Sequence, residues 1–85
     1  MNQTNQTQRR PTDTRITFVV AGDYSEFLKY QLTQPKVLRW VSNPQVLYGR
    51  TSDNMLMKIG SWHARDDIDE IDAMAKRFGI TEVRP

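Results

Sequence analysis

Four short apolar runs, separated by segments with helical patterning, constrain the fold of this 85-residue chain more than any other feature. The runs are RITFVVAG (15–22), KVLRWVS (36–42), NMLMKIG (54–60) and ITEV (80–83). The first combines β-branched and aromatic residues and is apolar on both faces, which predicts a central strand covered on both sides. The other three are predicted to be strands as well, with the last at an edge of the sheet.

The segment after the first run predicts a helix that starts near Asp23 and stops near Thr33. Asp23 and Glu26 have the spacing of a capping box, and Pro35 disfavours helix in the residue before it. One side of this helix is predicted to carry its apolar residues and to face the core. That side holds Phe27, Leu28, Gln31 and Leu32.

Two further helices are predicted from their end signals. NPQVLYG (43–49) should form one or two turns, because Asn43 suits a cap and Pro44 the first helical position. A longer helix is expected from about Asp66 to Phe78, with Gly79 at its C-terminal stop. Its apolar residues at helical spacing are Ile68, Ile71, Met74, Ala75 and Phe78, and Asp67 with Glu70 suggest a second capping box.

The alternation of strands and helices predicts an α/β fold with a mostly parallel four-stranded sheet between helical layers. We expect the strand order 2-1-3-4, a miniature of the doubly wound, flavodoxin-like or Rossmann-like plan. Residues 15–85 should form this single domain. Residues 1–14 contain one apolar residue, Met1, and are predicted to be a disordered tail.

Composition excludes several classes of function. The chain has no cysteine, and therefore no disulfide and no thiolate metal site or nucleophile. It has no apolar run that could cross a bilayer and no signal-peptide core, which predicts a cytoplasmic protein without membrane contact. The net charge is +2, and the basic residues form no stripe, so nucleic-acid binding is the weaker alternative.

A candidate binding crevice follows from the predicted strand order. The loops after the first and third strands would meet where the order reverses, which is where open α/β sheets usually bind ligands. The candidate binding residues there are Tyr24, Ser25, Ser61, Trp62, His63 and Arg65, with Tyr48 nearby. A nucleotide or small-anion binder, with Arg65 on the anion and Trp62 stacking on a ring, is one open function.

The phosphate interpretation lacks its usual motifs. The first loop is AGDYSE, which matches neither GxxxxGK[ST] nor GxGxxG. Acidic residues occupy the start of both helices that border the crevice, where they complement the helix dipole and would repel a phosphate. These acids are Asp23, Glu26, Asp66, Asp67, Asp69 and Glu70.

Metal and catalytic sites are not predicted. A metal would need His63 with Asp66 and Asp67, but Asp67 and Asp69 point about 200° apart on a helix. Nucleophilic catalysis would need Ser25 or Ser61 activated by His63, and no GxSxG elbow is present. The chain is therefore predicted to be no enzyme and to carry no cofactor.

The stretches LRWVSNPQVLYGR and MLMKIGSWHARDDIDEI resemble small α/β proteins of unassigned function encoded by tailed phages. The resemblance covers roughly residues 15–80. It implies a phage protein in the host cytoplasm, with an accessory or host-modulating role, and it transfers no catalytic residue.

The first functional hypothesis is thus a non-enzymatic protein-binding module. A symmetric homodimer is expected to help so small a core, and the partner surface is predicted at the rim of the crevice. That rim comprises Tyr24, Trp62, His63 and Arg65, with Tyr48 nearby.

Overall fold

The computed structural model describes residues 15–85, so the prediction of a disordered tail at 1–14 lies outside the described residues. The elements, in chain order, are β1 (Thr17–Val20), α3 (Tyr24–Gln31), β2 (Arg39–Trp40), the 3-10 helix η1 (Pro44–Leu47), β3 (Met55–Lys58), the 3-10 helix η2 (Trp62–Ala64), α4 (Ile68–Arg77) and β4 (Thr81–Val83).

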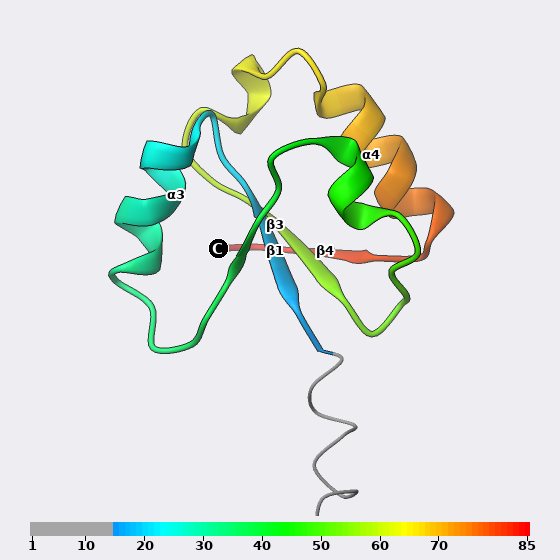
Figure 1. Ribbon diagram of the computed structural model, residues 1–85, viewed down its shortest axis with the longest axis horizontal. Coiled ribbons are helices and arrows are strands. Elements are labelled where there is room, and N and C mark those ends of the chain that lie inside the picture. The colour runs from blue at the N-terminus through cyan, green and yellow to red at the C-terminus, as the bar shows by residue number, and fades with distance from the viewer. Residues whose placement is uncertain (1–14) are drawn as a thin grey trace, which may run out of the picture.

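The four strands form one parallel sheet in the order β2-β1-β3-β4. Phe18 of β1 pairs with Arg39 on one side and Leu56 on the other, and Leu56 pairs with Glu82 of β4. Helix α3 covers one face of the sheet, while α4 and η1 cover the other (Figure 1). The predicted α/β fold and strand order are confirmed.

The strands are shorter than predicted, most of all β2. The amide of Val41 still bonds to the carbonyl of Val19 in β1 (3.1 Å), but other main-chain groups on both sides of Arg39–Trp40 bond to side chains. Gln31 donates to the carbonyl of Lys36 (2.8 Å) and accepts from the amide of Leu38 (2.7 Å). Arg65 binds the carbonyls that follow the strand. The loop predicted at 61–65 contains a 3-10 turn, η2.

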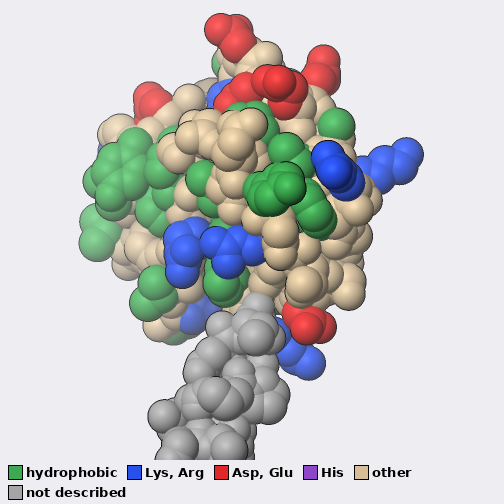
Figure 2. Space-filling model, turned by 45° about the vertical axis from the view of Figure 1, so that its right-hand side comes forward, with side chains coloured by type: hydrophobic (Ala, Val, Ile, Leu, Met, Phe, Trp, Pro, Cys, Tyr) green, Lys and Arg blue, Asp and Glu red, His purple; other side chains and the backbone are tan. Residues whose placement is uncertain are grey.

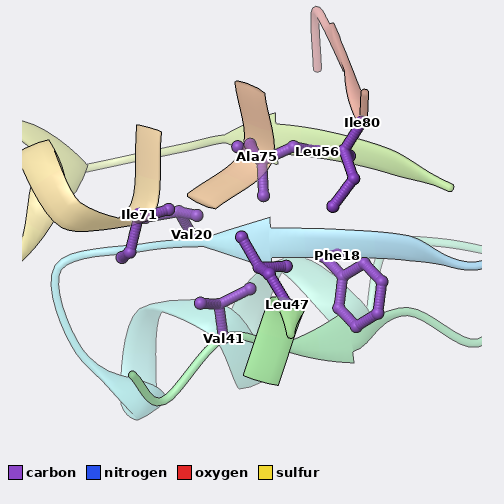
Figure 3. Close-up of a cluster of buried hydrophobic side chains, with 8 residues drawn as sticks. All are labelled: Phe18, Val20, Val41, Leu47, Leu56, Ile71, Ala75 and Ile80. Atoms are coloured by element: carbon purple, nitrogen blue, oxygen red, sulfur yellow. The ribbon is translucent and has the colours of Figure 1, made fainter. Parts of the chain in front are cut away.

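The larger core lies between the sheet and α4 (Figure 3). Its buried residues are Phe18, Val20, Val41, Leu47, Leu56, Ile71, Ala75 and Ile80. Leu47 reaches this core because η1 is held at its start by Asn43, whose Oδ1 accepts from the amide of Gln45 (2.9 Å). The predicted cap of this short helix is therefore formed.

Lys58 crosses the same face of the sheet and joins three elements. Its Nζ lies 2.8 Å from Asp72 of α4 and 3.3 Å from Glu82 of β4, and 4.7 Å from the ring centre of Trp62. Burial by itself would lower the pKa of Lys58, but these two carboxylates outweigh burial and raise the pKa above its ordinary 10.5. The ion pairs fasten edge strand β4 and α4 to the centre of the sheet.

The smaller core lies between the sheet and α3. It contains Val19, Ala21, Phe27, Leu38 and Ile59, with Tyr30, Trp40 and Met57 partly buried beside them. Phe27 is the buried residue of α3. Leu28 and Leu32, predicted to face the core, are instead exposed, because a helix directs residue 28 about 100° away from residue 27.

The two predicted capping boxes have different outcomes. Asp23 caps α3 by accepting from the amide of Glu26 (2.9 Å), but the Glu26 carboxylate binds the amides of Gly22 and Ser61 instead of that of Asp23, so the first box is half formed. Asp67 occupies the capping position of α4 but makes no such bond, because its carboxylate is bound by Arg65. The second capping box is therefore absent.

Candidate functional site

The crevice predicted at the carboxyl ends of β1 and β3 is closed by direct contact between the two loops. A Cβ atom on Gly22 would lie 2.8 Å from the Cβ of Ser61, so a larger residue would push the loops apart. Gly60 has φ +54°, and a Cβ there would lie 2.7 Å from a carboxylate oxygen of Glu26. The two glycines predicted to end these strands thus allow the close approach.

Glu26 of α3 occupies the amide groups between the loops. Its carboxylate accepts from the amide of Gly22 (2.7 Å), from the amide of Ser61 (3.0 Å) and from the Oγ of Ser61 (2.9 Å). These bonds, led by the one from the Ser61 amide, hold the pKa of Glu26 below its ordinary 4.5. A phosphate would use the same amide groups and would have to displace this carboxylate.

Arg65 is held by the protein through all of its hydrogen-bond donors. Nε and one Nη2 hydrogen bind the carboxylate of Asp67 (both 2.9 Å). Nη1 binds the carbonyls of Ala21 (3.3 Å) and Val41 (2.7 Å), and Nη2 also binds that of Ser42 (3.0 Å). Since a guanidinium has five N–H groups, no donor of Arg65 is left for an anion.

A hollow of about 480 Å³ lies outside these contacts, and it is open to solvent. Its lining residues are Gly22, Trp40, Ser42, Ala64, Arg65, Asp66 and Asp67. Arg65 and Asp67 neutralise each other, which leaves the exposed Asp66 as the free charge of the lining. The hollow therefore has the wrong sign of charge for a phosphate.

The predicted rim residues are divided between the two faces of the sheet. Tyr24 stacks on Phe27 and is tilted against Trp40 on the α3 side, with ring centres 5.9 Å away in both pairs. Trp62 packs against the core on the α4 side, and His63 lies edge-on to it at 5.5 Å. The crevice does not bring these aromatic rings together.

The remaining predicted residues have other positions. Ser25 is exposed in the first turn of α3. Ser61 donates its Oγ proton to Glu26 and not to His63, so no activated serine forms. Tyr48 lies edge-on to Phe78 at 5.5 Å, at the C-terminal end of α4 and thus away from the crevice.

An exposed apolar surface on α3 was missed by the sequence analysis. We call it the α3 patch; it consists of Tyr24, Leu28, Leu32 and Val37, which are 52%, 43%, 86% and 88% exposed. The first three recur every four residues, and this spacing was the available signal. The usual assumption that apolar helix residues face the core assigned Leu28 and Leu32 to the interior.

Among residues 15–85, no group of three or more His, Asp and Glu side chains is arranged to hold a metal ion. In the same part of the chain, no helix combines the length and apolar character that a membrane span requires.

Comparisons of the chain with protein-family models, with curated proteins and with solved structures gave no match.

Proposed function

We propose that this chain is a non-enzymatic protein-binding module whose contact surface is the α3 patch. The observation that carries the proposal is the clustering of exposed apolar side chains. Between residues 15 and 85, five large hydrophobic side chains are exposed, and four of them lie on α3 or on its connection to β2. Exposed apolar side chains gathered on one element are typical of interaction sites, whereas scattered exposed residues are not.

The patch is anchored on a rigid support. Tyr24 stacks on Phe27 and lies tilted against Trp40, and the rings of Phe27 and Trp40 are 5.6 Å apart. Gln31 ties the end of α3 to residues 36 and 38, so the connection that carries Val37 is held against the helix. An ordered aromatic anchor loses little conformational entropy when it is buried by a partner.

The crevice supports this proposal because its hydrogen-bond donors are already used within the protein. Its amide donors are engaged by Glu26 and its guanidinium donors by main-chain carbonyls and Asp67. An accessory or host-modulating role in a tailed phage is part of the proposal and rests on the sequence resemblance alone.

The test is site-specific photo-cross-linking in the cells that naturally make the protein. A photoreactive amino acid replaces Leu32 in one version and Val37 in another, since both side chains are almost fully exposed and their replacement leaves the core intact. We expect one discrete adduct of the same mass from both positions.

Ala73, exposed on α4, is the matched control position. An adduct from Leu32 and Val37 that is missing at Ala73 supports the proposal. No adduct from the patch, or the same adducts from Ala73, would contradict it.

A further inference from the structure

We infer that the partner of the α3 patch presents an acidic amphipathic helix. This inference rests on the proposed function and specifies the chemistry of its partner. It is argued from the spacing of the apolar residues, from the charges around them and from the state of the neighbouring strand edge.

The apolar residues form a straight stripe. Tyr24, Leu28 and Leu32 are four residues apart along α3, so the stripe runs for about 12 Å at 1.5 Å per residue. Two turns of a second helix match this length, and apolar side chains at intervals of three and four residues would interdigitate with the stripe.

The charges beside the stripe are basic. Lys29 lies on α3 and Lys36 lies on the segment that follows it, and both are exposed. Neither makes a direct ion pair with another residue of the described part of the chain, in contrast to Lys58 and Arg65. In Figure 2, which is turned so that the α4 side comes forward, hydrophobic side chains lie beside Lys and Arg side chains on the left-hand half of the molecule.

The acids near the stripe lie toward the start of α3, and one of them, Glu26, also attracts Lys29. Glu26 is bound to the loops of the crevice, and Asp23 caps the start of α3, at the opposite end from Lys36. A partner with carboxylates beside its apolar face would therefore complement the patch, and it would do so toward the C-terminal end of α3.

The neighbouring edge of the sheet disfavours an extended peptide as partner. Gln31 already binds the carbonyl of Lys36 and the amide of Leu38, which are main-chain groups of the segment leading into β2. A strand added there would have to break both bonds, whereas a helix on the α3 patch leaves them in place.

The experiment uses the full ¹⁵N-labelled chain and two synthetic helical peptides of about 16 residues, a length that allows helix formation in water. Both carry the same leucine stripe; one has glutamates beside it and the other lysines. We expect the acidic peptide to shift the amide signals of α3 and of residues 36–40, and to bind about tenfold more tightly than the basic peptide. Added salt should weaken this binding.

A charge-reversal variant provides the matched control. Replacing Lys29 and Lys36 together by glutamate leaves the apolar stripe intact, and it should invert the preference between the two peptides. The same replacement at Lys76 and Arg84, both exposed and outside the patch, should leave the preference unchanged.

Four results would overturn the inference: no shift with the acidic peptide, equal binding of both peptides, stronger binding to anionic lipid vesicles than to the peptide, or a stable homodimer that buries the α3 patch. Each concerns the chemistry of the partner. The proposed function itself is tested separately by the cross-linking experiment, so the two failures are distinguishable.

Discussion

At the scale of single residues, Arg65 holds three segments of the chain together. Its side chain is 9% exposed, and it joins the segments after β1 and β2 to the segment before α4. The carbonyls of Ala21, Val41 and Ser42 point at it because the last carbonyls of parallel strands have no further ladder partner. A planar group with five donors satisfies all of them at once.

Substituting Arg65 with lysine should therefore be costly although the charge is kept. Lysine offers three donors from one point and cannot reach the three carbonyls and Asp67 together. We expect a loss of about 3 kcal/mol in the free energy of unfolding, measured by urea denaturation. Arg84→Lys, at an exposed position, should change it by less than about 0.5 kcal/mol. Equal small effects in both variants would show that the hydrogen bonds of Arg65 are not needed for stability.

Glu26 should make the stability depend on pH in the acid range. Because its pKa is lower in the folded than in the unfolded chain, its contribution is present above about pH 4.5 and is lost as the pH falls through the lowered pKa. Urea denaturation from about pH 7 to about pH 3 should show this loss, and Glu26→Gln should be less stable near neutrality with a flatter acid dependence. Glu70→Gln, exposed on α4, should keep the native profile; a native profile in Glu26→Gln would argue against the role of the carboxylate.

The loop after β3 shows, at the scale of elements, why the strand ends where it does. Gly60 takes a positive φ and lies directly against the carboxylate of Glu26. Its main chain thereby turns so that the next amide, that of Ser61, points at Glu26. The end of β3, the turn and the first turn of α3 are one connected unit.

Replacing Gly60 with alanine should destabilise the protein more than the same change at Gly49. Both residues have positive φ, which costs about 1–2 kcal/mol for alanine. At Gly49 a Cβ would meet nothing within 4 Å, whereas at Gly60 it would clash with Glu26 at 2.7 Å. Thermal and urea unfolding should therefore show a larger loss for Gly60→Ala. Similar losses would mean that Glu26 moves aside without cost.

The element pattern was predictable, and the side-chain network of the crevice was not. Glycine after RITFVVA and MLMKI, and proline after asparagine at Pro44, are local signals that need no knowledge of the fold. The carbonyl partners of Arg65 come from two segments that are distant from it in sequence, at Ala21 and at 41–42, so its spacing to Asp67 gave no indication of them. The exposure of Leu32 depends on how much of the sheet α3 covers, which is a property of the assembled layers.

At the scale of the whole molecule, the two faces of the sheet bury hydrophobic clusters of different size. The face under α4 and η1 buries the larger cluster, and α4 is fastened to it by Lys58. The face under α3 buries a smaller cluster, with Met55, Met57 and Val83 only partly buried. Tyr24, Leu28 and Leu32 are exposed on the helix that covers this face, which is where a partner would complete the burial.

Leucine-to-alanine changes at Leu47 and Leu32 should separate stability from binding. A domain of this size has roughly 4 to 11 kcal/mol of stability. Leu47 is fully buried, so its truncation should remove about 2–5 kcal/mol and leave a chain that is close to unfolding. Leu32 is 86% exposed, so the same truncation should change the urea midpoint little. If the α3 patch is the contact surface, Leu32→Ala should nevertheless weaken binding of the acidic helical peptide several-fold, since it removes one anchor of the stripe. A Leu32→Ala variant with native stability and native peptide affinity would show that the α3 patch is not the contact surface.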